Sequence, residues 1–314
     1  MNKITRRKFV QNLALAGGSV VMGAETLVAA ERKRPSKLHL ACNQYPWLVF
    51  YQRENRDFNK DLDNGLGELA ASGMDGYEPL VTNPQEIDRL GPLLTKHGLQ
   101  MRSLYVNSVL HERQKADQSI DSVLDIAEKA KSSIGTKIIV TNPSPIQWGG
   151  PQNKDDSQLK VQAASMDKLG RQLKAMELTL AYHNHDIELR NAAREFHHMM
   201  VGTDPAYVTL CLDAHWIYRG AGNSAVALFD ILKLYGSRIT ELHLRQSKDN
   251  IWSETFEDGD INYRRLAKHL LDIDVRPHIV LEQAVEKRTP KTMKTVEAFR
   301  QSSKYARRIF AKFG

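Results

Sequence analysis

Four ionisable residues stand at the ends of short apolar runs, in the order His183, Asp213, His243 and Glu282. They recur every 30 to 39 residues, which is the length of one strand-plus-helix unit. In a parallel barrel the carboxyl ends of all strands open onto one face, so these side chains would converge despite their separation in sequence. Two imidazoles and two carboxylates form a nitrogen and oxygen ligand set for one divalent cation, such as Mn, Co, Mg or Zn. The spacing therefore predicts a metal site with these four residues as ligands.

Two further ionisable residues have positions that suit the same site. His185 follows His183 by two positions, and residues two apart on a strand point the same way, so both imidazoles could face the site. Glu78 ends another apolar run, although Tyr77-Glu78-Pro79 could equally form a capped turn.

Two tryptophans could either bind substrate or pack in the core, and two other histidines are expected outside the site. Trp148, which precedes a Gly-Gly pair, and Trp216 could stack against a sugar ring or pack as ordinary core residues. His197 and His198 fall in a helical pattern and are expected at the surface.

The elements that would carry these residues alternate between strand and helix. Eight apolar runs predict strands, namely Leu38–Cys42, Met74–Glu78, Gln100–Val106, Lys137–Thr141, Leu178–His183, Tyr207–Asp213, Ile239–His243 and His278–Glu282. Helical patterns lie between them, for example Asp61–Ser72, Asp117–Ser133, Asp156–Met176 and Tyr263–Ile273. Left-handed C-cap glycines are expected after helices, at Gly73, Gly98, Gly135 and Gly236.

This alternation predicts one α/β domain, a (β/α)8 TIM barrel. With 314 residues and 41% apolar content, the chain can bury one substantial core, and no second domain is required. An open doubly wound sheet is the competing architecture, but no Gly-x-Gly-x-x-Gly follows the first predicted strand.

The N-terminus predicts a targeting segment. The run Thr5-Arg6-Arg7-Lys8-Phe9-Val10 places a twin-arginine pair before a weakly hydrophobic stretch that ends in Val28-Ala29-Ala30, a small-residue cleavage site. A basic tail on a cytosolic protein is the alternative. We expect residues 1–30 to be a twin-arginine signal peptide and residues 31–314 to be the barrel domain. The mature protein is then expected in the periplasm or otherwise exported, with no stable membrane span.

Composition argues against a nucleic-acid-binding protein and against a disulfide-bonded protein. Residues 1–30 carry +3 of the formal net charge of +7, which leaves +4 on the predicted mature chain. We expect much of this excess on the solvated face of the last helix, in Lys287, Arg288, Lys291, Lys294, Arg300, Lys304, Arg307, Arg308 and Lys312. No aromatic-interleaved basic patch accompanies it, so nucleic acid is not an expected partner. Cys42 and Cys211 lie in the first and sixth strands, which are not neighbours in a barrel, so we expect two buried thiols.

The chain resembles a known family. From about residue 36 to its end it is similar to the xylose isomerase-like TIM barrels, the sugar phosphate isomerase/epimerase superfamily that also includes inosose dehydratases. The motifs that carry the resemblance are Gly76-Tyr77-Glu78, Tyr182-His183-Asn184-His185-Asp186, Leu212-Asp213-Ala214-His215-Trp216, Glu241-Leu242-His243-Leu244 and Leu281-Glu282.

The resemblance implies a ligand set and includes one departure. In ketose epimerases of this superfamily, Glu, Asp, His and Glu from strands five to eight hold the metal, and the two Glu residues also shuttle the proton. Asp213, His243 and Glu282 match the last three positions, whereas His183 stands where the first Glu would be. An imidazole can ligate a metal or accept a proton near neutral pH, so the reaction type survives this change while the two-carboxylate mechanism does not.

The implied function is an exported, metal-dependent sugar isomerase or epimerase. A base would abstract the proton next to a sugar carbonyl, and the metal would stabilise the enediolate. The candidate catalytic residues are His185, Glu282 and Glu78, with Glu78 or Glu188 also able to orient hydroxyls. The candidate substrate-binding residues are Glu188, His215, Trp216 and Arg245. The expected partner is a small carbohydrate, and a homo-oligomer is an expectation from the family alone.

Three alternatives remain open. The same enolisation could end in loss of a β-substituent, as in a dehydratase or a lyase acting on 3-keto-glycosides. Export favours this outcome, because sugar phosphates are cytoplasmic metabolites and no basic phosphate-binding loop is visible. A periplasmic carbohydrate-binding protein could keep the barrel without the chemistry, since fold does not fix function. A DNA-repair endonuclease is disfavoured, because the chain lacks an expanded ligand set for a multi-metal centre.

Overall fold

The computed structural model describes residues 37–314, and the predicted signal peptide lies outside the described residues. Eight parallel strands form one sheet, namely β1 (Leu40–Asn43), β2 (Gly76–Glu78), β3 (Ser103–Ser108), β4 (Ile138–Pro143), β5 (Thr179–His183), β6 (Val208–Asp213), β7 (Ile239–Leu244) and β10 (His278–Leu281). All eight predicted strands are confirmed, with ends that differ by a few residues. Their order in the sheet is β2-β1-β10-β7-β6-β5-β4-β3.

The sheet curves into a nearly closed barrel. Its outer strands, β2 and β3, are joined by two isolated parallel bridges, Gly76 to Gln100 and Leu80 to Tyr105. The neighbouring ladders set the levels of the strand ends, with His183 opposite Cys211 and Asp213 opposite His243. The predicted (β/α)8 TIM barrel is therefore confirmed.

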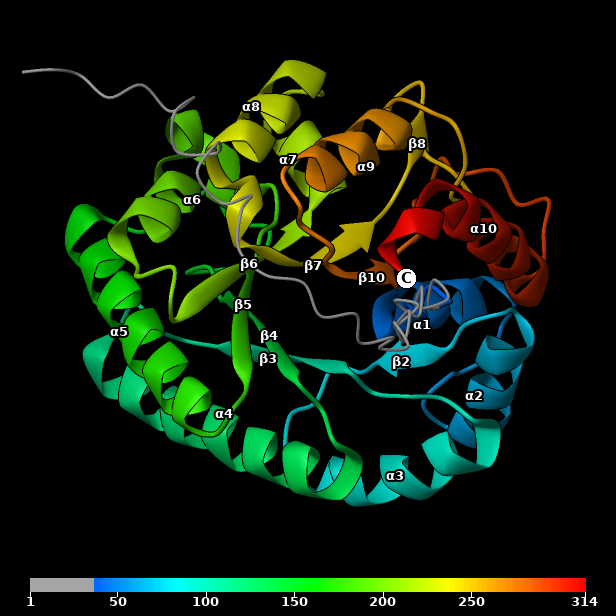
Figure 1. Ribbon diagram of the computed structural model, residues 1–314, viewed down its shortest axis with the longest axis horizontal. Helices are drawn as coiled ribbons and strands as arrows, with labels where there is room; N and C mark the ends of the chain where they lie inside the picture. Colours follow the sequence, from blue (N-terminus) through cyan, green and yellow to red (C-terminus); the bar gives the residue numbers. More distant parts are fainter. Residues whose placement is uncertain (1–36) are drawn as a thin grey trace, which may run out of the picture. The chain divides into compact units, whose positions relative to one another are not determined.

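Helices surround the strands (Figure 1). They are α1 (Gln44–Arg53), α2 (Leu62–Ala71), α3 (Gln85–His97), α4 (Arg113–Ile134), α5 (Asp156–Ala175), α6 (Arg190–Gly202), α7 (Ala214–Gly220), α8 (Ala225–Tyr235), α9 (Tyr263–Asp272) and α10 (Thr295–Ile309), with 3-10 turns at Ile187–Leu189, Gly236–Arg238 and Ala311–Phe313. A small antiparallel hairpin, β8 (Ser247–Lys248) and β9 (Ile251–Trp252), lies between β7 and α9. Within residues 37–314 no helix combines the length and the apolar character that crossing a membrane demands.

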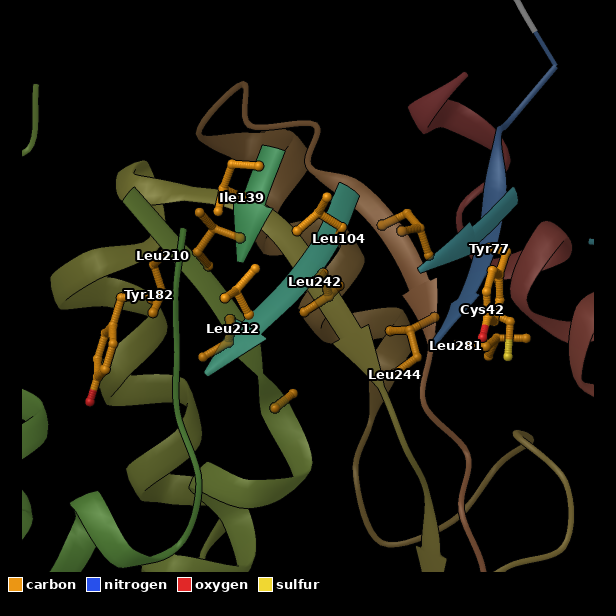
Figure 2. Packing of buried hydrophobic residues seen from close by; sticks show 14 of the residues in the cluster. Cys42, Tyr77, Leu104, Ile139, Tyr182, Leu210, Leu212, Leu242, Leu244 and Leu281 are labelled. Atoms are coloured by element: carbon orange, nitrogen blue, oxygen red, sulfur yellow. The ribbon is translucent and has the colours of Figure 1, made fainter. Parts of the chain in front are cut away.

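Alternation along the strands separates two environments. Leu210, Leu212, Leu242 and Leu244 belong to the large apolar core, and Figure 2 shows their side chains along successive strands. The alternating neighbours form a different set: Cys211 packs with Val140 and Ala181 in a small second cluster, while other positions are polar. Residues two apart on a strand share a face. Asp213 and His243 alternate with these leucines, so their side chains lie on the opposite face of the sheet from the large core.

Two local predictions need correction. Gly98 and Gly135 are left-handed C-caps as expected, and Gly73 also has positive φ, but Gly236 caps α8 with a right-handed φ of −56° because a 3-10 turn continues the chain. The predicted basic set does not lie on one helix, because α10 begins only at Thr295 and the lysines and arginine of residues 287–294 precede it. Both cysteines are free and buried, as predicted.

Candidate functional site

The structure brings the four predicted metal ligands together. His183 ends β5, Asp213 ends β6, His243 lies near the end of β7, and Glu282 directly follows β10. One ligand atom from each can be chosen so that all four lie within 4.8 Å of one another. His183 Nε2 is 3.6 Å from Glu282 Oε2 and 4.0 Å from Asp213 Oδ2, and His243 Nδ1 is 2.8 Å from Glu282 Oε2. All four side chains are buried.

Local hydrogen bonds fix the position of Asp213. The Asn184 amide bridges the ends of β5 and β6, because its Nδ2 donates to the Asp213 carbonyl and its Oδ1 accepts from the Asp213 N–H, each at 3.1 Å. Asp213 is also the N-cap of α7, and its Oδ1 accepts from the Trp216 N–H at 2.8 Å. One carboxylate oxygen therefore holds the helix, and the other is left to face the cluster.

The buried atoms of the cluster fit a metal cation. Asp213 Oδ2 and both ring nitrogens of His183 lie buried without a hydrogen-bond partner, which is costly for groups that no ligand satisfies. Burial raises the pKa of Asp213 to about 7, although the charge of Arg245 opposes this. Burial lowers the pKa of His183, so its imidazole is neutral and able to ligate. This donor set suits a divalent ion that accepts nitrogen and oxygen ligands.

The second ring nitrogen of His243, Nε2, contacts a pair of glutamates. His243 Nε2 is 3.1 Å from Glu78 Oε1 and 3.1 Å from Glu241 Oε1. Burial opposes ionisation of Glu78, yet the charge and hydrogen bond of His243 hold its pKa well below the usual range. Burial and the neighbouring Glu78 raise the pKa of Glu241 to about 8. Outer carboxylates of this kind orient a ligating imidazole through its second nitrogen.

Hydrogen bonds from β1 and β3 fix the position of Glu78, one of the expected catalytic residues. Its Oε1 accepts from Asn43 Nδ2 and its Oε2 accepts from Ser103 Oγ, both at 2.7 Å, and the side chain is fully buried. Glu78 does not line the cavity described below, because these bonds hold it against the Nε2 side of His243, away from the edge that meets Glu282. Its contact with His243 Nε2 suits a residue that positions this imidazole.

An open cavity of about 380 Å³ adjoins the cluster. Its lining consists of Asn43, Gln44, Tyr45, Leu48, Leu80, Tyr105, Asn107, Trp148, His185, Trp216, Arg245, Trp252 and Glu282. Among the predicted substrate-binding residues, Trp216 and Arg245 are present in this lining. Glu188 and His215 are fully buried and absent from it, because Glu188 binds backbone and amide groups behind His185 and the ring of His215 packs against Tyr218 and Trp252.

His185 forms one wall beside the candidate metal ligands. Its ring centroid is 4.7 Å from that of His183, which confirms that the two imidazoles of the His-Asn-His run are neighbours. Burial and the adjacent His183 lower the pKa of His185 well below its usual value, so the ring is neutral at pH 7. Its backbone N–H donates to Glu188 Oε2 at 2.6 Å. Burial and Glu195 raise the pKa of Glu188 to about 7.

Arg245 neutralises part of the acidic cluster. Its Nη2 is 2.9 Å from Glu282 Oε1 and 3.8 Å from Asp213 Oδ2. The guanidinium also lies 4.9 Å from the Trp216 ring centroid and 4.4 Å from that of Trp252. Burial opposes ionisation of Glu282, but Arg245 and the two imidazoles lower its pKa well below the usual range. Glu282 is thus charged and engaged on both oxygens, by Arg245 on Oε1 and by His243 on Oε2.

Comparison with protein families identifies the barrel. Residues 66–309 match the family described as "Xylose isomerase-like TIM barrel". The chain belongs to this family. The sequence resemblance is thereby confirmed for the barrel.

Relatives with assigned names are distant. An inosose dehydratase from Clostridium botulinum is 24% identical over 206 residues, which cover 62% of this chain and 66%, just under two thirds, of the relative. An inosose dehydratase from Clostridium perfringens is 22% identical over 246 residues, covering 69% of this chain and 80% of the relative.

Solved structures share the family's barrel. A sugar phosphate isomerase/epimerase from Parabacteroides distasonis superposes with a TM-score of 0.67 at 18% identity, covering 88% of this chain and 96% of that one. The 3-keto-D-glucoside 4-epimerase from E. coli gives 0.63 at 13% identity, covering 87% and 100%. A Mycobacterium smegmatis family member in complex with magnesium gives 0.67 at 12% identity, covering 88% and 98%.

The sequence analysis did not identify several residues that line or adjoin this site. Tyr105 on β3 lines the cavity, and its ring lies 5.3 Å from that of His183. Trp252 comes from the β8–β9 hairpin, whose turn residues Asp249 and Asn250 both have positive φ. That Asp-Asn pair is a local turn signal in the sequence. Glu241 was noticed only as part of a motif, since no pattern shows that it lies beneath His243.

The prediction that His197 and His198 lie at the surface is confirmed only in part. His197 and His198 lie on α6 as predicted, but both are half-buried. His197 Nδ1 is 2.8 Å from the hydroxyl of Tyr235, so this imidazole packs between two helices. Neither residue lines the cavity.

Proposed function

We propose that this protein is a metal-dependent enzyme of the sugar isomerase/epimerase type, which removes the proton next to a sugar carbonyl. One observation carries the proposal: four buried candidate ligands, two of them with unpartnered atoms, converge beside an open cavity that presents a neutral imidazole. The relatives named as inosose dehydratases and the structures of sugar epimerases support a carbohydrate substrate.

His183, Asp213, His243 and Glu282 would hold one divalent cation. When bound, such a cation polarises a carbonyl and stabilises the negative charge that develops on its oxygen. His185 accepts the proton, because its ring is neutral, lines the cavity and keeps Nδ1 without a protein partner. Its backbone bond to Glu188 holds the loop that carries it. Trp216 and Trp252 flank Arg245 in the cavity lining.

Elimination is the second candidate outcome. Epimerisation needs a second acid or base on the opposite face of the sugar, and the family position that supplies it is His183 in this chain. Glu282 is the carboxylate that lines the cavity, and Arg245 and His243 occupy its two oxygens. A single free base favours loss of a β-substituent after proton removal, as in a dehydratase or a lyase of 3-keto-glycosides. We further propose export by the twin-arginine route, on the sequence evidence alone.

The test compares metal content with turnover. Asp213→Asn keeps the oxygen that caps α7 while it weakens the ligand, so it should fold, lose bound metal and lose turnover together. Asp125→Asn, exposed on α4, is the control and should retain both. Elemental analysis of purified protein should give about one equivalent of metal. Product analysis by NMR then separates epimers from elimination products. Turnover that persists in metal-stripped protein would refute the proposal.

A further inference from the structure

Exposed apolar side chains gather at the mouth of the cavity. Tyr45, Leu80 and Trp148 are 44%, 38% and 53% exposed, and all three line the cavity. Ile146, 43% exposed, is in the same β4–α5 loop as Trp148. In residues 37–314, the remaining exposed large apolar side chains are on or next to α6, α8 and α9, and none of them lines this cavity. Grouped exposed apolar residues at a cleft mark a ligand or partner surface.

Hydrogen bonds within the protein occupy two of the three amide side chains in the cavity lining, those of Asn43 and Gln44. Gln44 Oε1 accepts from the Leu80 N–H at 2.8 Å, and its Nε2 donates to Asn59 at 2.9 Å. Asn43 is likewise engaged, with Glu78 through Nδ2 and with the Tyr45 N–H through Oδ1. Asn107 is the other amide in the lining. These two amides are therefore not available to the hydroxyls of a second sugar, and the exposed surface of the mouth is mainly aromatic and aliphatic.

The charged lining residues also do not suit a phosphate. His185, Arg245 and Glu282 are the ionisable side chains of the lining apart from tyrosines. Arg245 is buried, pairs with Glu282 and lies between two indoles. A phosphate at this site would meet the Glu282 carboxylate, while the lining has no lysine and its one arginine is already paired.

The apolar mouth begins next to the proposed base. The Trp148 ring lies 5.1 Å from the ring of His185 in an edge-to-face arrangement. A group that projects from the carbon adjacent to the deprotonated one would therefore leave the metal ligands and enter the mouth. The cavity of about 380 Å³ is in the range, from about 300 Å³ upward, that encloses drug-sized ligands.

We propose that this mouth, lined by Tyr45, Leu48, Leu80 and Trp148, is a subsite for the aromatic aglycone of a 3-keto-glycoside. The inference rests on the proposed function and names its substrate class. The base takes the proton from C2, next to the C3 ketone, and the C1–C2 double bond forms. The C1–O bond breaks, its electron pair leaves with the aglycone oxygen, and that oxygen takes up a proton. The ketone is already present in the substrate, so no oxidant is consumed.

Binding and turnover can be tested separately. Phenyl β-D-glucoside and methyl β-D-glucoside have no ketone, so both report on binding alone. Calorimetry with the full-length protein should give about tenfold tighter binding of the phenyl glucoside, since stacking on aromatic rings adds to apolar burial. Trp148→Ala and Leu80→Ala should each reduce this preference, and the double variant should abolish it. Val226→Ala, exposed on α8, is the control and should leave it unchanged.

The outcomes distinguish the subsite from the chemistry. Equal affinity for the two glucosides, tighter binding of cellobiose than of the phenyl glucoside, or a preference that survives in the double variant would overturn the inference. Proton exchange at C2 of methyl 3-keto-glucoside without any aglycone preference would support the proposed function and refute the subsite. An aglycone preference with neither exchange nor elimination at C2 would support the subsite and refute the proposed function.

Discussion

Replacement of Glu78 by glutamine separates a positioning role from a catalytic one. The carboxylate lies 3.1 Å from His243 Nε2 and accepts hydrogen bonds from Asn43 and Ser103. In Glu78→Gln the amide oxygen can still accept from Asn43 and His243, and the amide nitrogen can donate to the Ser103 hydroxyl. The substitution thus removes the negative charge with little change in shape.

The expected effect is on metal affinity. Loss of an outer carboxylate behind a ligating histidine weakens metal binding about 10- to 100-fold, which corresponds to about 1.4 to 2.8 kcal/mol. Because Glu78 does not line the cavity, turnover at saturating metal should change little. If Glu78 were instead the general base, turnover at saturating metal would fall about 10²- to 10⁴-fold.

Competition with a metal-binding dye measures the first quantity, and initial rates across a metal titration measure the second. Glu54→Gln is a suitable control, because Glu54 binds Thr295 and Arg56 and is not one of the grouped metal-binding candidates. Its variant should keep wild-type metal affinity. Unchanged affinity in Glu78→Gln, or a loss of turnover that added metal does not restore, would refute the positioning role.

Three further predictions concern catalysis and pH. His185→Gln should lower turnover about 10²- to 10⁴-fold while elemental analysis finds unchanged metal, and loss of the metal would contradict this role. Burial opposes ionisation of Asp75, but the hydrogen bond from the Leu40 N–H and the charge of Arg307 lower its pKa. Asp75→Asn should therefore cost about 1.5 to 3 kcal/mol at pH 7, and in urea unfolding the difference from wild type should disappear as pH falls below the unfolded value near ~3.9 and through the folded pKa; a difference independent of pH would contradict it. Burial and Glu195 raise the pKa of Glu188 to about 7, so wild-type stability should fall as pH rises from the ordinary glutamate value of about 4.3 towards 7. Glu188→Gln should flatten that slope, and an unchanged slope would count against it.

The barrel and its ligand cluster could be predicted because both depend on strong local signals. Each predicted strand is a short apolar run, and each candidate ligand ends or follows a run. In a parallel barrel all strand ends face one side, so convergence of His183, Asp213, His243 and Glu282 needs only topology.

The depth of each side chain could not be predicted in this way. Glu78 also ends a strand, but barrel register places it on the Nε2 side of His243, where Asn43 and Ser103 bind it. Register depends on the pairing of all eight strands, and no single segment encodes it. The same limit applies to Glu241, which contacts His243 from two positions earlier on β7.

The residues that loops contribute to the site could not be predicted from the sequence pattern either. Trp252 reaches the cavity on a two-residue strand, which is too short for a recognisable period. Gly236 caps α8 as predicted, but the 3-10 turn that follows keeps it right-handed instead of left-handed. Periodicity indicates the elements, whereas irregular connections follow from packing.

The most direct test of the central claim is exchange of solvent deuterium into substrate. Proton NMR in heavy water would follow the carbon next to the carbonyl in a panel of keto-sugars and methyl 3-keto-glucoside. The metal-loaded protein should catalyse exchange or elimination at that carbon, and chelator-treated protein should not until metal is restored. If folded, metal-loaded protein leaves that proton in place across the whole panel, the proposed chemistry is wrong and the site is better explained as that of a carbohydrate-binding protein.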